Sequence, residues 1–454
     1  MLWAMRRRVT FSRNLTLSLS RTCVSHCKYC AFATHKPHLH EPDEVERLLD
    51  GAARRRVKEL LVLTGDDPGH HPGVRERLTR LGFDDFVAYV VWCCERALER
   101  GILPHTNLGA LSRDDLARLR EVTASQGMML ESLRDDLVAH QGSPTKDPAL
   151  RLATLEAAGE LRIPFTSGIL VGIGESEEDR MEALAALAHL HERYGHLQEV
   201  ILQNFVPHPR YYGAEPGEIA AEAQRGERAP GEALELPAWA SEIRLDDLRR
   251  LVRECRRLMP DVGIQIPPNL SDWWLALVAE GATDLGGLSA NGDHISPEHP
   301  FPSPHEVRKR LRPHGYALTE RLCVYPQYMD ETWVDPGVLG VLRERFPTFL
   351  PRRRSSNGNG IPTVNGDVVA RAIAKGREGA ELDPSELAAL FAERRPEAIE
   401  EMRQGADELR RARRGRRHVR RQPEHQLHQR LHGRLRLLRL RSDAALARRL
   451  RARA

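Results

Sequence analysis

The feature that most constrains the fold is an alternation of short apolar runs with longer amphipathic runs between residues 12 and 290. The apolar runs have the length of buried strands, and the intervening runs have the length of helices. Such units build a parallel sheet, because parallel neighbours need a long crossover connection. Eight strands are predicted, at Leu15–Ser20, Glu59–Thr64, His105–Leu111, Met128–Ser132, Ile163–Ile173, Val200–Phe205, Gly263–Pro267 and Thr283–Ser289.

This pattern predicts an α/β fold of the (β/α)8 type, as a full or partly open barrel. Helices are expected at Pro42–Arg55, Asp85–Arg100, Arg113–Val122, Asp147–Ala158, Glu177–Tyr194, Leu245–Leu258 and Ser271–Glu280. Barrels of this type carry their chemistry at the carboxyl ends of the strands. The candidate site residues are therefore those that directly follow predicted strands.

Composition divides the rest of the chain. We expect the barrel over residues 9–300, a short helical C-terminal extension over 301–350, a Pro-, Gly- and Ser-rich linker over 351–367 and a helical segment over 368–410. Residues 410–454 contain 17 Arg and two acidic residues, whereas the whole chain has a net charge of +4. The rest of the chain is thus acidic, which argues against a protein that binds nucleic acid along its whole length.

Other features point to an intracellular protein. No stretch approaches the roughly 18 apolar residues of a membrane helix, and the N-terminal segment lacks the apolar core of a signal peptide. Seven cysteines in 454 residues do not form a disulfide scaffold. We therefore expect a cytoplasmic location with reduced thiols, and neither a membrane nor a nucleic acid as partner.

Three of the cysteines follow the first predicted strand at close spacing. Cys23, Cys27 and Cys30 form a C-x3-C-x2-C motif. Three thiolates on one loop can bind three irons of a cubane cluster and leave the fourth iron open to a small ligand. The alternative is a structural zinc site, which needs a fourth ligand, and His26 or His35 (or the nearby His38) could supply it.

The cysteine motif resembles that of the radical S-adenosylmethionine (SAM) enzymes. The resemblance implies a 4Fe-4S cluster held by the three cysteines, with the open iron bound to the amino and carboxylate groups of SAM. It also implies that reductive cleavage of SAM gives a 5′-deoxyadenosyl radical, which abstracts hydrogen from the substrate. Tyr29, the aromatic residue before the last cysteine, would then lie near the adenine.

Two further segments match this superfamily at predicted strand ends. Gly65 and Asp66 in LTGDDP occupy the position of the Gly-Gly-Glu motif that holds the SAM amino group, and an Asp carboxylate accepts the same hydrogen bonds. Gly172 lies in GILVGIGE (Gly168–Glu175), which resembles the adenine-contacting motif. The structural alternatives are a common Gly-Asp turn and a buried strand followed by turn glycines.

Polar residues at other strand ends are weaker candidates for cofactor or ligand binding, and each could instead be a structural hydrogen-bonding group. They are Asn107, Glu131, Ser167, Gln203 and Asn204. The remaining cysteines, Cys93, Cys94, Cys255 and Cys323, are expected in the core. No catalytic proton donor or acceptor is assigned from the sequence.

A closer resemblance involves TFSRN before the first predicted strand, AHQGSPTKDP (Ala139–Pro148), ERYGHLQEVILQNF (Glu192–Phe205) and IQIPPNLS (Ile264–Ser271). These strings resemble the cyclising radical SAM component of FO synthase, a family that makes the chromophore precursor of coenzyme F420. The resemblance implies a carbon–nitrogen lyase that closes the ring of an adduct of tyrosine and 5-amino-6-(D-ribitylamino)uracil and releases ammonia. It also implies an electron donor such as ferredoxin or flavodoxin, and a 4-hydroxybenzyl transferase half or subunit as partner.

The tail departs from this family. In some relatives the cyclising half is followed by a second radical SAM half, yet residues 411–454 carry no second cysteine cluster. Read one base later, permitted codons for His418–His432 encode a strand and first cysteine of such a half. We therefore hypothesise a bifunctional synthase truncated by a frameshift, with an out-of-frame, disordered tail and no transferase activity.

Alternatives from other classes stay open at this stage. Within the enzymes, these are a radical SAM enzyme acting on a futalosine-like substrate and the tyrosine–uracil 4-hydroxybenzyl transferase. Outside the enzymes, they are a zinc-binding structural protein and a module that binds nucleic acid through the Arg-rich tail.

Overall fold

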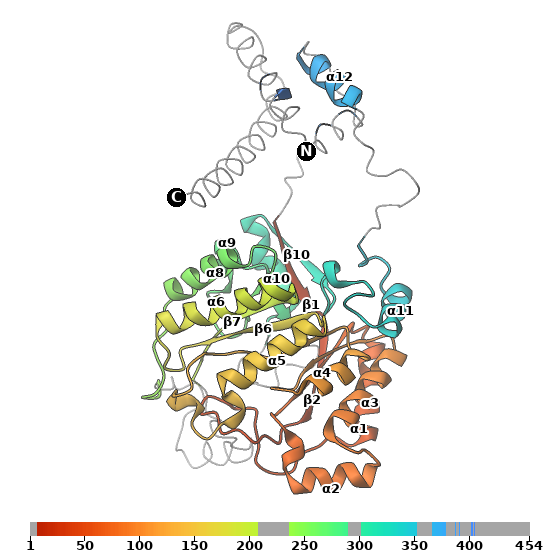
Figure 1. The fold of residues 1–454 in the computed structure, drawn as a ribbon, viewed down its shortest axis with the longest axis vertical. Coiled ribbons are helices and arrows are strands. Elements are labelled where there is room, and N and C mark those ends of the chain that lie inside the picture. Colours follow the sequence, from red (N-terminus) through yellow and green to blue (C-terminus); the bar gives the residue numbers. More distant parts are fainter. Residues whose placement is uncertain are drawn as a thin grey trace. The chain divides into compact units, whose positions relative to one another are not determined.

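The computed structural model describes residues 7–207, 236–288, 301–351 and 366–377, with isolated positions up to residue 404 (Figure 1). Residues Met1–Pro351 and Arg352–Ala454 form two separate compact units. In the second unit the described helix is α12 (Gly366–Arg377). The predicted Arg-rich tail and most of the predicted linker lie outside the described residues.

The first unit is built on one sheet of ten parallel strands in the order β10-β1-β9-β8-β7-β6-β5-β4-β3-β2. The strands are β1 (Arg7–Ser12), β2 (Asn14–Ser20), β3 (Glu59–Thr64), β4 (Leu103–Asn107), β5 (Ser125–Gly127), β6 (Phe165–Val171), β7 (Leu197–Asn204), β8 (Gly263–Gln265), β9 (Asp284–Gly287) and β10 (Tyr316–Arg321). The sheet curls into a partly open barrel, so the predicted fold class is confirmed.

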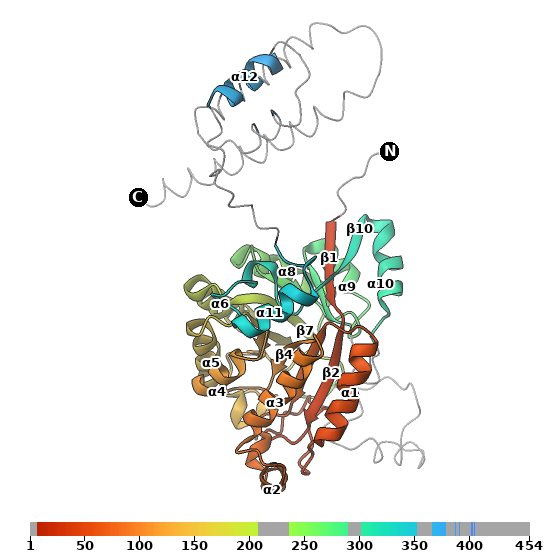
Figure 2. The ribbon, with the colours of Figure 1, turned by 90° about the vertical axis from the view of Figure 1, so that its right-hand side faces the viewer.

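The barrel curls because its first extended segment belongs to both sides of the sheet. Strands β1 and β2 are separated by Arg13 alone. β1 pairs with β9 and β10, whereas β2 pairs with β3. One continuous run of chain therefore joins the two flanks of the sheet, and Figure 2 shows β1 and β2 following one another along the barrel wall.

Helices cover the outer face of the sheet (Figures 1 and 2). They are α1 (Pro42–Arg54), α2 (Pro72–Leu81), α3 (Phe86–Glu99), α4 (Arg113–Arg120), α5 (Pro148–Glu160), α6 (Glu177–Tyr194), α8 (Leu245–Leu258), α9 (Trp274–Glu280), α10 (Pro304–Leu311) and α11 (Pro336–Arg345). Two large apolar clusters fill the space between helices and strands, one against β6 to β9 and one against β2 and β3. Local signals fix the helix starts: Ser176 and Asp179 form a capping box at α6.

The concave face of the sheet is partly open to solvent. In β7, Ile201 and Gln203 are partly exposed, whereas Val200 and Leu202 between and beside them are fully buried against the helices. Side chains alternate between the two faces of a strand. The accessible residues therefore lie on the inner face, and they include Leu61 on β3 and Gln265 on β8.

The structure corrects several of the predicted elements. The strand predicted at Met128–Ser132 lies instead at Ser125–Gly127, which is β5. The residues after Gly127 leave the strand conformation. Strands β1 and β10 and helix α2 were not predicted. The C-terminal extension is therefore not only helical, because it also supplies β10 to the sheet. In the described part of the chain, no helix combines the length and apolar character needed to cross a membrane.

Candidate active site

The three motif cysteines lie on the loop that leaves the carboxyl end of β2. Cys23 and Cys27 are buried, and Cys30 is partly exposed. Backbone N–H groups point at two of the sulfurs: those of Ser25 and Asp66 donate to Cys23 Sγ at 3.4 and 3.2 Å, and that of Ala33 donates to Cys30 Sγ at 3.4 Å. The loop backbone thus orients N–H dipoles toward sulfur, an arrangement that stabilises thiolates bound to metal.

The end of β3 packs directly against the cysteine loop because Gly65 has no side chain. Its N–H donates to the Ser20 carbonyl at 2.9 Å. A Cβ atom at this position would lie 2.7 Å from Cys23 Cβ, closer than such atoms approach. Glycine therefore allows the close approach that places Asp66 beside Cys23, so two of the sequence-predicted sites meet here.

Burial controls the protonation of the free thiols. Burial, with a smaller contribution from Asp66, raises the pKa of Cys23 to about 12, and burial with the neighbouring Cys27 raises the pKa of Cys30 to about 11. Within the described residues, no three His, Cys, Asp or Glu side chains converge on one point tightly enough for a single metal ion. A cubane cluster binds each thiolate at a different iron, and three cysteines on one loop supply three such thiolates.

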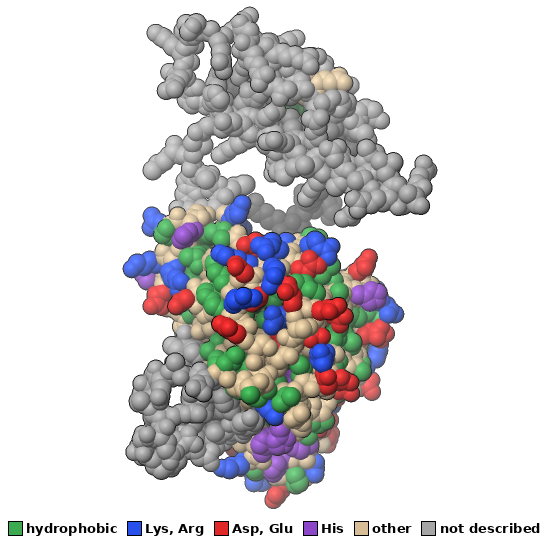
Figure 3. All heavy atoms as spheres, turned by 90° about the vertical axis from the view of Figure 1, so that its left-hand side faces the viewer, with side chains coloured by type: hydrophobic (Ala, Val, Ile, Leu, Met, Phe, Trp, Pro, Cys, Tyr) green, Lys and Arg blue, Asp and Glu red, His purple; other side chains and the backbone are tan. Residues whose placement is uncertain are grey.

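The histidines considered as further zinc ligands make contacts with other residues in this structure. The rings of His26 and His35 stack at the surface, with centroids 3.9 Å apart. His38 Nδ1 accepts a hydrogen bond from the Arg21 N–H at 3.2 Å. Figure 3 shows histidine side chains gathered at one end of the described surface.

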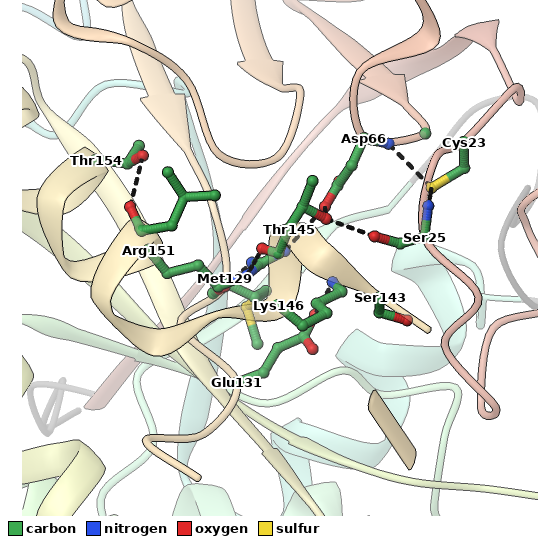
Figure 4. Close-up of polar contacts among 12 residues, drawn as sticks. Cys23, Ser25, Asp66, Met129, Glu131, Ser143, Thr145, Lys146, Arg151 and Thr154 are labelled. Atoms are coloured by element: carbon green, nitrogen blue, oxygen red, sulfur yellow. Dashed lines mark hydrogen bonds and ion pairs between the residues drawn. The ribbon is translucent and has the colours of Figure 1, made fainter. Parts of the chain in front are cut away.

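Glu131 is the centre of a buried polar cluster beyond β5 (Figure 4). Its carboxylate accepts hydrogen bonds from Tyr29 Oη, from His140 Nε2 at 3.2 Å and from Lys146 Nζ at 2.8 Å. Burial alone would raise the pKa of Glu131, but Lys146 and Arg151 hold it well below its usual range. The predicted residues Tyr29 and Glu131 are thereby brought together with two cations that the sequence reasoning missed.

Arg151 on α5 connects this cluster to the cysteine loop. Its Nη2 lies 3.1 Å from Asp66 Oδ2, its Nε donates to the Thr145 carbonyl at 2.9 Å, and its Nη1 donates to the Met129 carbonyl. The side chain is almost fully buried. Figure 4 shows these groups converging between the cysteine loop and β5. The site thus holds two carboxylates, Asp66 and Glu131, and two cations, Lys146 and Arg151, all with little solvent exposure.

Lys146 and Arg151 had a signal in the sequence that was not used. Arg151 occupies the same face of α5 as the buried residues Leu155 and Ala158, four and seven positions further along. An arginine in an apolar stripe indicates a buried partner. Lys146 ends the short 3-10 turn η3 (Pro144–Lys146) inside the string AHQGSPTKDP.

The glycine-rich end of β6 forms a tight loop. Gly172 has a φ of 99°, which favours glycine. The N–H groups of Gly172 and Ile173 both donate to the Glu175 carboxylate at 2.7 Å, and Arg180 Nε lies 2.6 Å from it. The motif therefore stabilises its own turn, and Gly172 stays a proposed cofactor contact.

The other predicted residues are more dispersed. Asn107 ends β4 and Gln203 lies near the end of β7, and both are partly exposed. Ser167 is fully buried, and its Oγ accepts a hydrogen bond from the Leu130 N–H at 3.2 Å. Asn204 is buried, and its Nδ2 donates to the Leu270 carbonyl at 3.3 Å. Gln203 and Asn107 thus remain available to a ligand, whereas Ser167 and Asn204 contact the backbone.

Comparison with known proteins agrees with this geometry. Residues 17–187 match the Radical SAM superfamily. The fold resembles the hydrogenase maturase HydG, with a TM-score of 0.53 at 16% identity over 91% of this chain and 84% of that one. HydG from Carboxydothermus hydrogenoformans gives a TM-score of 0.51 at 17% identity, over 88% and 77% of the two chains. The partly open barrel and its three-cysteine loop define the class as radical SAM proteins.

Relatives identify the family within this class. The 7,8-didemethyl-8-hydroxy-5-deazariboflavin synthase of Methanoculleus marisnigri is 44% identical over 343 residues, which cover 74% of this chain and 95% of the relative. The synthase of Methanothermobacter thermautotrophicus is 39% identical, over 75% of this chain and 99% of the relative. The chain belongs to the 7,8-didemethyl-8-hydroxy-5-deazariboflavin (FO) synthase family.

Proposed function

We propose that this chain is the FO synthase that closes the deazaflavin ring for coenzyme F420 biosynthesis. Its substrate would be 5-amino-5-(4-hydroxybenzyl)-6-(D-ribitylimino)uracil, and ammonia would leave as the ring forms. The supporting observation is the placement of the three-cysteine loop against Asp66, beside a buried cluster of paired charges, in a chain that spans nearly the whole length of named synthases.

Cys23, Cys27 and Cys30 would hold the 4Fe-4S cluster. When bound and reduced, this cluster supplies the electron that cleaves SAM and so generates the 5′-deoxyadenosyl radical. The N–H groups of Ser25 and Asp66 would keep their hydrogen bonds to Cys23 sulfur. These bonds favour the thiolate form, which counteracts the effect of burial on its pKa.

The charged residues next to this loop match the charges of SAM. Asp66 would accept hydrogen bonds from the ammonium group, and Arg151 and Lys146 would face the carboxylate. The carboxylates and cations already neutralise one another, through Asp66 with Arg151 and Glu131 with Lys146. An amino acid zwitterion can therefore replace these contacts without leaving a buried charge unpaired.

Burial of these groups also excludes water from the reacting region. Glu131 and His140 are buried, the Lys146 side chain is only 11% exposed, and Tyr29 Oη bonds to the Glu131 carboxylate. Tyr29 would keep its proton, because burial and the neighbouring Cys27 and Glu131 raise its pKa well above the usual range. The ring is thus a neutral surface suited to the adenine.

The remaining aspects of the proposal concern class and partners. We assign the reaction to the carbon–nitrogen lyases and expect ferredoxin or flavodoxin as electron donor. A 4-hydroxybenzyl transferase half or subunit would supply the adduct. The frameshift hypothesis, and with it the loss of a second activity, concerns residues outside the described part.

Anaerobic reconstitution tests this proposal. The protein is loaded with iron and sulfide and supplied with SAM, a reductant and the tyrosine–uracil adduct, and deazaflavin fluorescence is recorded. We expect product from the wild type and none from Cys27→Ala, with Cys93→Ala as a matched control that leaves the loop intact. Product formation by Cys27→Ala at the wild-type rate would contradict the assignment.

A further inference from the structure

Two glutamine side chains lie on the accessible concave face of the barrel. Gln203 on β7 and Gln265 on β8 are both partly exposed, whereas their neighbours Leu202 and Ile264, on the outer face of the same strands, are buried. Ile201 and Gln265 are register partners, and Gln203 lies two residues beyond Ile201 on the same face. The two carboxamides therefore occupy neighbouring positions on adjacent strands.

The Gln265 side chain contacts Glu199, which lies on β7 toward the N-terminal end of the strands. With its amide nitrogen facing Glu199, Nε2 donates to the two carboxylate oxygens at 3.1 and 3.3 Å. Glu199 is itself fixed by Arg321 Nη2 at 3.0 Å and Tyr325 Oη at 3.1 Å. The orientation of the Gln265 amide is therefore determined by a buried network before any ligand binds.

Each of the three acids on the N-terminal side of Gln265 has a hydrogen-bond partner in the barrel interior. Arg321 binds Asp284 Oδ2 at 2.6 Å as well as Glu199, and Thr10 Oγ1 also donates to Asp284. Glu59, the remaining nearby acid, accepts from Ser12 Oγ. Gln265 thus presents a neutral carboxamide at the partly accessible face of the barrel.

A neutral, oriented carboxamide complements a pyrimidinedione. The imide edge of a uracil ring offers one N–H donor between two carbonyl acceptors. A carboxamide offers an acceptor and a donor side by side, so the two can form a pair of hydrogen bonds. The uracil-derived substrate bears a polyol and no phosphate, so neutral amides suit it better as binding groups than the cations of arginine or lysine.

We propose that Gln265, positioned by Glu199, recognises the imide edge of the pyrimidinedione ring and so determines substrate specificity. This inference rests on the proposed function, because that function supplies the uracil-derived substrate. Gln203, on the adjacent strand, supplies a second amide to the same ligand.

Equilibrium binding tests the inference independently of turnover. The ligands are FO and its N3-methyl analogue, titrated anaerobically into reconstituted protein with SAM while ligand fluorescence is followed. The proteins are the wild type, Gln265→Ala, Gln265→Asn and the surface control Gln327→Ala. Circular dichroism establishes that each variant is folded, and the Asn variant keeps the amide while withdrawing it from the ligand.

The wild type and Gln327→Ala should bind FO about tenfold more tightly than the N3-methyl analogue, since methylation removes a donor from a buried hydrogen-bonded site. Gln265→Ala and Gln265→Asn should bind both ligands with similar, weaker affinity. Equal discrimination by wild type and folded Gln265 variants overturns the inference while leaving the proposed function intact. A wild type that makes FO but binds both ligands equally also overturns it, whereas a wild type that makes no FO overturns the proposed function first.

Discussion

Replacement of Arg321 by methionine should destabilise the barrel strongly. Arg321 ends β10 and bridges two acids from other strands, with its Nε 2.6 Å from Asp284 and its Nη2 3.0 Å from Glu199. Asp284 is fully buried, and Glu199 is 3% exposed. Arg321→Met therefore leaves carboxylates in the barrel interior without their cation.

The burial of these ion pairs determines how much stability Arg321→Met should lose. Removing one partner of a buried ion pair costs about 3–5 kcal/mol, because the remaining charge is uncompensated. An exposed pair such as Arg343–Glu331, with side chains 50% and 68% exposed, contributes less than about 1 kcal/mol. The matched variant Arg343→Met should therefore be close to the wild type in its free energy of unfolding.

Urea unfolding of the wild type, Arg321→Met and Arg343→Met measures the difference. The loss of unfolding free energy caused by Arg321→Met should be smaller at pH 5 than at pH 8. Burial already raises the pKa of Glu199 to about 8, and loss of the guanidinium raises it further. The folded variant then binds more protons than the unfolded chain at intermediate pH, so its stability falls as pH rises.

A triple variant completes the test. Adding Glu199→Gln and Asp284→Asn to Arg321→Met removes the unpaired charges and should recover most of the lost stability. If Arg321→Met unfolds within 1 kcal/mol of the wild type at pH 8, the cluster does not carry buried charge, and the reasoning fails.

Three further perturbations test other parts of the structure. Gly65→Ala should displace the loop at Cys23 and reduce iron incorporation on reconstitution, measured by iron content; full loading would show that the close approach is not needed. Lys146→Met should weaken SAM binding about tenfold or more in anaerobic calorimetry, since the variant lacks the ammonium group that would face the SAM carboxylate; unchanged affinity would contradict the assignment. Burial, with a contribution from a neighbouring histidine, lowers the pKa of His196 to about 3. Below pH 6.5 the unfolded chain therefore takes up a proton that the folded chain does not, so stability falls with falling pH. His196→Leu should remove about 2 kcal/mol of this loss at pH 5 in urea unfolding, and a parallel pH dependence of variant and wild type would refute it.

The strands with continuous apolar runs could be predicted from the sequence. β2, β3 and β6 agree with the predicted segments to within a few residues, because each is a buried strand with few polar residues on its outer face. β10 could not be recognised in this way. It is an edge strand, YALTER, whose residues are mostly only partly buried, and its partner β1 lies at the other end of the chain.

The strand β5 shows that an apolar run in the sequence need not form the strand. The sequence Met128–Ser132 is more apolar than Ser125–Gly127, yet the shorter polar segment forms the strand. Glu131 instead takes a left-handed conformation with a φ of 66°, and its N–H and carbonyl bond to β6. This turn is what directs its carboxylate toward Tyr29, so the error in the strand assignment coincides with the site.

The candidate site was predictable where motif and strand end coincide, as at Cys23, Gly65 and Asp66. The cations Lys146 and Arg151 were not predicted, because they come from a turn and a helix that follow β5 rather than from a strand end. Their proximity to Glu131 and Asp66 depends on long-range packing that local patterns do not encode.

The β1–β2 segment pairs with both flanks of the sheet, and this has a consequence for folding during synthesis. Thr10 of β1 bonds to Thr283, 273 positions further along the chain, and β10 follows later still. During translation the first strand emerges from the ribosome long before its neighbours exist, and contacts of such sequence separation form slowly. The nascent chain must therefore carry an unpaired strand edge until its final third is made, and this interval is when it is most exposed to aggregation and to chaperones.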